Sequence, residues 1–251
     1  MTKMRELLRL LRSRVHTAKA WPDRALQRRK ALRFYSQFIR QDDLCFDIGA
    51  NLGSRTDIFL RLGAHVVVVE PQEVCIRHLR KRFGRDMRVA LLQTAVGEAE
   101  GEGKLLLCEA HTVSSMSREW VESVTASGRF SALRWEKAVM VNVTTLDRLI
   151  EEYGEPTFCK IDVEGFELPV VRGLSRPIKA VSFEFVPEYI DATIRCMDHL
   201  QRIGMTRFNY SIGESMSLAL TKWVSAERIT GMLGRMGGQL VFGDVYARSI
   251  E

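Results

Sequence analysis

The sequence predicts an α/β fold: a doubly wound, mostly parallel sheet with a C-terminal antiparallel element and an N-terminal helical arm. Two observations predict it. From residue 42 onward, short continuous runs of β-branched and other apolar residues alternate with helical segments, as is typical of parallel strands covered on both faces. Near the end, a strand-like run, a helical run and a last strand-like run indicate the antiparallel element.

The elements are expected in a regular order. Leu44 begins a buried apolar run, and Gly63 and Gly84 follow two helical runs that they are suited to end. The expected strands cover 44–48, 65–70, 88–93, 104–108, 139–143, 158–162, 179–185, 208–212 and 240–247. The expected helices cover 54–62, 73–83, about 187–203 and about 225–236.

The 251 residues are expected to form one domain over residues 41–251, preceded by a basic arm over residues 1–40. The arm holds twelve Lys or Arg against two acids, a net +10, so the remainder carries −4 of the total of +6. The arm could be helices packed on the body, or a basic amphipathic element that contacts an anionic membrane surface or an acidic carrier. Because the body is acidic and shows no recognition module, no nucleic-acid partner is expected.

The compartment is expected to be cytoplasmic, with peripheral association at a membrane as the alternative. No stretch approaches the roughly 20 apolar residues of a membrane-spanning helix, and the N-terminus lacks the pattern of a signal peptide. The five cysteines are scattered and form no Cys-x-x-Cys pair, which argues against a zinc site or a disulfide framework.

The stretch CFDIGANLGSRT joins the first predicted strand to the first helix. Ligands of open α/β sheets bind beyond the carboxyl ends of such strands. Gly49 and Gly53 are expected to leave room for a ligand, beside N–H groups of the following helix that have no partner within the helix. Glu70 ends the second strand 23 residues after Asp47, which is the place for an acid that accepts both ribose hydroxyls of an adenosine ligand.

The turn also indicates which nucleoside cofactor it holds. It lacks the Gly-x-Gly-x-x-Gly pattern that admits a pyrophosphate, and there is no phosphate-binding Gly-Lys-[Ser/Thr] loop. The acid Asp47 would repel a pyrophosphate but suits the ammonium group of a methionine moiety, which favours S-adenosylmethionine (SAM). Asn51 in the turn, and Gln93 and Ala95 at the end of the third strand, are further expected cofactor contacts.

Five segments, in this order, resemble the FkbM-type SAM-dependent methyltransferases: DIGANLG, VVVVEP, TTLDRL, KIDVEGFEL and SFEF. The resemblance covers roughly residues 42–212, and KIDVEG is its most specific element. It implies the class I methyltransferase (Rossmann-like) fold. It also implies methylation, typically of a hydroxyl on a sugar, polyketide or other small metabolite. The basic arm lies outside the matched region.

The acceptor side of the site is expected around KIDVEG. Asp162 ends a strand where the methyl group should face its acceptor, so it could orient or deprotonate a hydroxyl or help hold a divalent cation. Glu164 and His111 are the other candidate catalytic residues. Glu184, in an apolar strand, is either a structural acid with a partner or a site acid. A metal is possible but has no further support.

Two neighbouring residues and one insertion have simpler interpretations. Glu167 is expected to cap a helix, and Lys160 to be a surface lysine with a buried stem. The Ser-rich segment 111–137 is either an acceptor lid or a helical cover in which Trp120 and Trp135 pack.

The leading interpretation is an O-methyltransferase acting on a small molecule or glycan-type metabolite. Transfer to nitrogen or carbon stays open because the residues that bind the cofactor do not indicate which acceptor is methylated. From other classes, a nucleotide-binding oxidoreductase is disfavoured by the missing third glycine and by Asp47. A non-catalytic SAM-binding protein is mildly disfavoured by the acids at 162 and 164.

Overall fold

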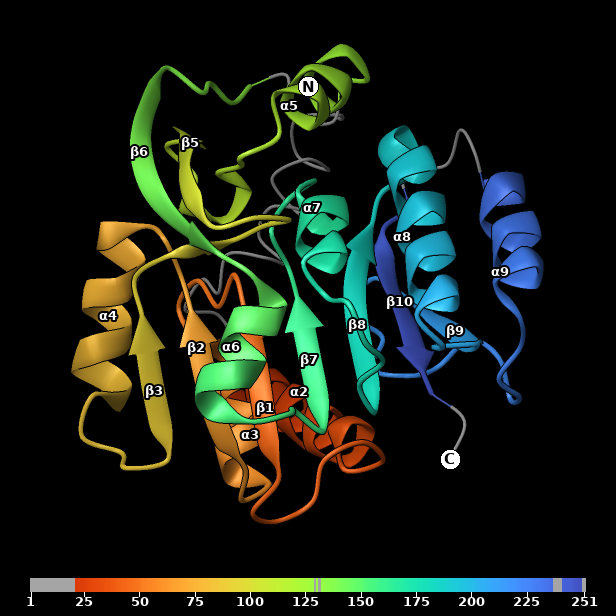
Figure 1. Cartoon of the computed structure of the whole chain (residues 1–251), viewed down its shortest axis with the longest axis horizontal. Helices are drawn as coiled ribbons and strands as arrows, with labels where there is room; N and C mark the ends of the chain where they lie inside the picture. Colours follow the sequence, from red (N-terminus) through yellow and green to blue (C-terminus); the bar gives the residue numbers. More distant parts are fainter. Residues whose placement is uncertain (1–20, 129, 131, 237–240, 250–251) are drawn as a thin grey trace.

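The computed structural model in Figure 1 describes residues 21–128, 130, 132–236 and 241–249. Residues 1–20 of the expected basic arm lie outside the described residues. So does residue 240, the start of the last expected strand.

The main sheet has seven strands with β1 near its centre and an antiparallel pair at one edge. Strands β1, β2, β3, β7 and β8 are parallel, and β10 runs antiparallel to both β8 and β9. The predicted doubly wound sheet with its C-terminal antiparallel element is therefore confirmed. In spatial order the strands are β3 (Val89–Leu92), β2 (His65–Val69), β1 (Leu44–Ile48), β7 (Phe158–Ile161), β8 (Ala180–Phe185), β10 (Gly243–Arg248) and β9 (Arg207–Ile212).

Helices cover both faces of this sheet, because successive side chains of each strand point to opposite faces. Phe46 and Ile48 of β1 face one apolar cluster, whereas Cys45 faces the other. The first cluster is closed by α6 (Leu146–Tyr153), α7 (Glu167–Arg172), α8 (Ile190–Arg202) and α9 (Ala226–Leu233). The second is closed by α2 (Trp21–Tyr35), α3 (Ser54–Arg61) and α4 (Glu73–Phe83).

The strands expected at 104–108 and 139–143 form, but they belong to a separate small sheet. Its strands are β4 (Ala95–Val96), β6 (Lys137–Thr144) and β5 (Gly101–Leu107), with β6 in the middle. Strand β6 is antiparallel to β5 and parallel to β4. Figure 1 shows this sheet above the ends toward which the parallel strands run. It therefore overhangs the edge where a ligand is expected.

The insertion between β5 and β6 contains η1 (His111–Val113) and α5 (Arg118–Ala126). Ser117 caps α5 by accepting a hydrogen bond from the backbone N–H of Trp120 at 3.1 Å. The Trp120 side chain is 1% exposed and packs against Phe130 and Trp135. The tryptophans pack as the helical-cover alternative predicted, and the insertion carries a small apolar core of its own. Whether it also acts as an acceptor lid stays a prediction.

The second half of α2 is part of the body. Phe34 and Tyr35 are buried against the sheet, and the ring of Tyr35 packs edge-on against Phe59 of α3. All five cysteines are buried and unpaired, as the scattered spacing predicted. Across the described part of the chain, the helices are too short or too polar to cross a bilayer.

Candidate active site

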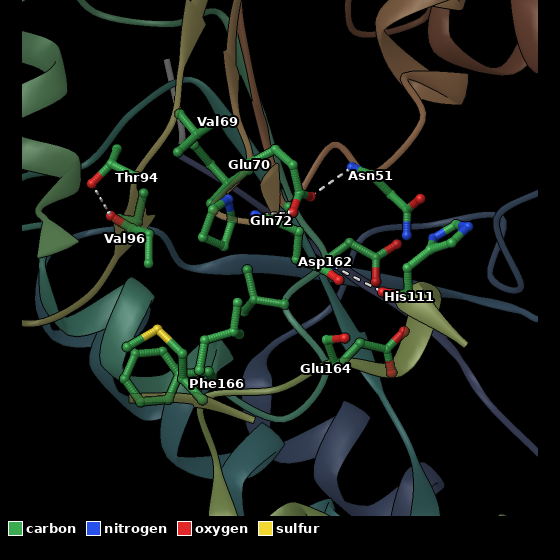
Figure 2. A pocket seen from close by; sticks show the side chains of 18 of the residues that line it. Asn51, Val69, Glu70, Gln72, Thr94, Val96, His111, Asp162, Glu164 and Phe166 are labelled. Carbon is green, nitrogen blue, oxygen red and sulfur yellow. Dashed lines mark hydrogen bonds between the residues drawn. The ribbon is translucent and has the colours of Figure 1, made fainter. Parts of the chain in front are cut away.

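A cavity opens at the carboxyl ends of β1, β2 and β7, beneath the small sheet. The space inside it, including the part that is open to solvent, is about 510 Å³. It brings together seven residues that the sequence predicts for the site: Gly49, Asn51, Glu70, Ala95, His111, Asp162 and Glu164. Figure 2 shows Glu70 and Asn51 on one side of the cavity and Glu164 and His111 on another, with Asp162 between them. The cofactor half and the acceptor half of the predicted site therefore share one cavity.

The glycines of the β1–α3 turn are required by the protein's own packing. Gly49 has φ +78°, and a Cβ there would lie 2.0 Å from the backbone oxygen of Asp162. A Cβ on Gly53 would lie 2.4 Å from the ring of Phe83. A side chain at either position would therefore collide with protein atoms, and contact between these glycines and a ligand stays a prediction. Gly49 still lines the cavity, so its backbone remains available to a cofactor.

Glu70 lies at the end of β2 with 2% of its surface exposed. One carboxylate oxygen accepts a hydrogen bond from the backbone N–H of Asn51 at 2.9 Å, and the other accepts from that of Gln72 at 2.8 Å. Burial raises the pKa of Glu70 to about 7, although these two hydrogen bonds oppose the shift. Glu70 thus ties the β1–α3 turn to β2 while lining the cavity.

Three predicted cofactor residues lie outside the cavity lining: Asp47, Gly53 and Gln93. Asp47 is buried under the turn, where it accepts a hydrogen bond from the hydroxyl of Thr56 at 2.5 Å, and burial raises its pKa. The exposed side chain of Gln93 binds Glu73 at 2.8 Å. For these three residues, contact with the cofactor remains a prediction.

The turn after β7 presents Asp162 and Glu164 to the cavity. Glu164 has φ +53°, and Gly165 follows with φ +87°. Glu167, the first residue of α7, accepts hydrogen bonds from the backbone N–H groups of Val163 and Gly165 at 3.3 and 3.2 Å, so its side chain binds the preceding turn instead of the helix N–H groups that a cap would bind. Burial raises the pKa of Glu167 to about 7. From the insertion, Ser115 donates to the Glu164 carbonyl at 2.6 Å, so the turn is held from two sides.

Three carboxylates meet at this edge of the sheet. One oxygen from each of Asp162, Glu164 and Glu184 lies within 4.8 Å of the other two. Glu184 comes from β8 and is 8% exposed; both predicted alternatives, a structural acid and a site acid, are compatible with this position. Such a donor set can accept a proton from an acceptor group or hold a divalent cation.

His111 reaches the cavity from the insertion. Its backbone carbonyl accepts a hydrogen bond from the side chain of Gln72 at 2.9 Å, which fixes η1 over the end of β2. The Nδ1 atom of His111 is buried and has no hydrogen-bond partner among the described residues. Burial lowers the pKa of His111, so the neutral ring can accept a proton at pH 7. Gln72 is a site residue that the sequence did not indicate.

Lys160 is buried, in contrast to the surface lysine expected from the sequence. Its side chain is 1% exposed, and its Nζ lies 3.4 Å from Oδ2 of Asp162. The two residues are two positions apart at the end of one strand, so their side chains leave the same face. The expectation failed because it treated the lysine in isolation from its neighbour.

A smaller cavity lies next to the first and is lined by Trp120, Gly165, Glu167 and Glu184, with residues from the start of α8. Glu184 belongs both to this lining and to the carboxylate group described above. The insertion and the turn after β7 therefore meet at this second cavity. No lysine or arginine occurs among the described residues that line either cavity.

The contact between Gly165 and Trp120 gives a stability prediction. A Cβ at Gly165 would lie 2.1 Å from Cγ of the buried Trp120, and the φ of +87° disfavours any side chain. We expect Gly165→Ala to lower the free energy of unfolding by about 2 kcal/mol or more, because overpacking and backbone strain add. Urea denaturation measures this change.

The matched control is Gly231→Ala, in helix α9, where a Cβ meets nothing within 4 Å. Alanine is the better helix former, so this variant should gain up to about 1 kcal/mol. Equal stability of the two alanine variants would contradict the close packing of Trp120 on Gly165.

Comparison with known proteins assigns the chain to a family. The family model described as the methyltransferase FkbM domain matches residues 47–212. The match begins at Asp47 in β1 and ends with β9, so it contains the whole cavity lining. A search of curated proteins finds no match.

Solved structures with a similar arrangement of elements are remote in sequence. A precorrin-6Y C5,15-methyltransferase from Geobacter metallireducens is 10% identical over 88% of this chain and 87% of its own, with a TM-score of 0.47. A TehB-like SAM-dependent methyltransferase from Corynebacterium glutamicum is 9% identical over 88% of each chain, with a TM-score of 0.45. An rRNA methylase from Streptococcus thermophilus is 9% identical over 88% of this chain and 95% of its own, with a TM-score of 0.44.

Proposed function

Because the chain belongs to the FkbM family of SAM-dependent methyltransferases, we propose that it methylates a hydroxyl group of a small molecule or glycan-type metabolite. The observation that carries this proposal is the group of Asp162, Glu164 and Glu184, of which Asp162 and Glu164 line the cavity that also contains Glu70. A hydroxyl must lose its proton during methylation, and carboxylates at the acceptor edge suit that task.

The residues of the cavity fit SAM. Glu70 lies at the end of β2, where an acid can accept hydrogen bonds from ribose hydroxyls. The lining acids Glu70, Asp162 and Glu164 complement a positively charged sulfonium. When bound, SAM supplies an electrophilic methyl group. The backbone at Gly49 and the side chain of Glu70 would hold it.

The chain's own part in the reaction is positioning and proton removal. Asp162 follows a central strand and is placed to accept the hydroxyl proton. The turn that carries Asp162 is held by Glu167 and Ser115, which restricts the orientation of the acceptor. In a displacement of this kind, orientation accounts for much of the acceleration. His111 is the alternative base, because its neutral ring lines the same cavity.

A small uncharged acceptor is favoured over a nucleic acid. Asp162 and Glu164 line the cavity, and no lysine or arginine lines it among the described residues. Nucleic-acid sites neutralise phosphates with cationic side chains, so this lining would repel an RNA backbone. An amine acceptor is the second candidate, since carboxylates attract its ammonium form.

The test is an acceptor screen with methyl-labelled SAM, with product mass spectrometry to locate the new methyl group. Polyhydroxylated metabolites, amines and total RNA form separate arms. Label in an O–CH₃ group of a small molecule supports the proposal. Label confined to amines or to RNA would overturn it.

A further inference from the structure

The buried ammonium of Lys160 links strand β7 to strand β10. It donates a hydrogen bond to the backbone carbonyl of Ile161 at 3.0 Å and another to Oδ1 of Asp244 at 3.0 Å. Its third neighbour is Oδ2 of Asp162 at 3.4 Å. A lysine ammonium has three protons; two of them are used in these hydrogen bonds, and the contact with Asp162 is an ion pair.

Asp244 reaches the lysine from β10, across the intervening strand β8. In the sheet register Lys160 pairs with Ser182 of β8, and Ser182 pairs with Tyr246 of β10. The hydroxyl of Tyr246 donates to Oδ2 of Asp244 at 3.3 Å. One carboxylate oxygen of Asp244 is therefore bound by Tyr246 and the other by Lys160, so the orientation of this carboxylate is fixed.

The charges in this group are arranged to keep the lysine ionised. A buried ammonium without a counter-charge would lose its proton. Here Asp162 and Asp244 raise the pKa of Lys160 well above its usual value, against the effect of burial. One acid would be enough to balance the charge of the buried lysine. The second contact, to the partly exposed Asp162, therefore points to an additional role.

We propose that Lys160 is a positioning residue that fixes the carboxylate of Asp162 for the acceptor, with Asp244 anchoring the lysine from β10. Asp162 lies just beyond the end of β7, and its side chain is 40% exposed. An exposed aspartate samples several rotamers. A fixed ammonium at one oxygen selects an orientation, and orientation errors of about 1 Å can cost roughly 10²-fold in rate. This inference rests on the proposed role of Asp162.

The test is a double-mutant cycle on methyl transfer between Lys160→Met and Asp162→Asn. If the lysine acts through the aspartate, Lys160→Met should lower kcat by about 10- to 100-fold. The pair should then be no slower than Asp162→Asn alone. SAM affinity by calorimetry should stay within about twofold of wild type. The exposed Lys104→Met, on β5, is the matched control and should change neither quantity.

Lys160→Met also leaves Asp244 without its cation, so the variant could lose stability. A variant that carries both Lys160→Met and Asp244→Asn loses both charges together. Neither charge is then left without its partner, so the cycle with Asp162→Asn can be measured on folded protein. An unchanged kcat in this folded Lys160→Met and Asp244→Asn variant would overturn the positioning role. So would a loss of kcat that adds to the loss caused by Asp162→Asn. A fully active Asp162→Asn enzyme would overturn both this inference and the proposed base, whereas additive losses would overturn this inference alone.

Discussion

Asp162→Asn is expected to lower the rate of methyl transfer by about 10²-fold or more, the scale of general acid–base contributions. Asparagine keeps the size of the side chain but cannot take up the acceptor proton. SAM affinity should stay near that of the wild type, because the predicted ribose contact is made by Glu70. Single-turnover rates and calorimetric titration with SAM separate the two effects.

The control is Glu98→Gln, which removes an exposed acid paired with Arg172 outside the cavity and should leave the rate unchanged. Assays of the wild type with and without a chelator distinguish a base from a cation ligand, since only the second role depends on added metal. A stable, fully active Asp162→Asn enzyme would contradict the assignment and move it to Glu164, Glu184 or His111.

Glu70→Gln is expected to weaken SAM binding by about 1.5–3 kcal/mol, roughly 10- to 100-fold in Kd. The two oxygens of Glu70 accept from the N–H groups of Asn51 and Gln72. A glutamine can accept only one of these bonds and turns an amide donor toward the other. Glu73→Gln, on the exposed face of α4, is the matched control. An unchanged Kd in folded Glu70→Gln would exclude the ribose role.

The raised pKa of Glu70, about 7, adds a pH dependence. Ribose hydroxyls donate to the ionised carboxylate, so SAM affinity should increase from pH 6 to pH 8 in the wild type and much less so in Glu70→Gln. The stability of the ligand-free protein changes with pH in the opposite direction. A folded pKa above the unfolded value stabilises the protein at low pH, and this contribution is lost as the pH rises through about 7.

The sequence predicted the main sheet well because its signals are local. The run Leu44–Ile48 and the helix Glu73–Phe83 were predicted with their observed limits, since a short, largely apolar run and a terminal glycine mark such elements directly. The separate sheet of β4, β6 and β5 could not be predicted in this way. Which strand pairs with which depends on contacts between distant segments, and a single sequence does not encode these locally.

The same limit applies to the site. Glu70 and Asp162 could be placed in advance because each ends a strand at the ligand edge of the sheet. The environment of Lys160 could not, because Asp244 lies 84 positions away and reaches it only through the strand order β7–β8–β10. Gln72 was missed for a related reason: its partner, the carbonyl of His111, comes from an insertion.

The burial of all five cysteines makes the chain a convenient host for site-directed probes. Burial raises the pKa of Cys75 to about 12 and those of Cys45 and Cys159 further, so few thiolates exist near pH 8 to react with alkylating reagents. One cysteine introduced on the surface would then be modified selectively without removal of the native ones. A spin label or fluorophore on the sheet of β4, β6 and β5 would show whether this sheet moves relative to the main sheet during turnover.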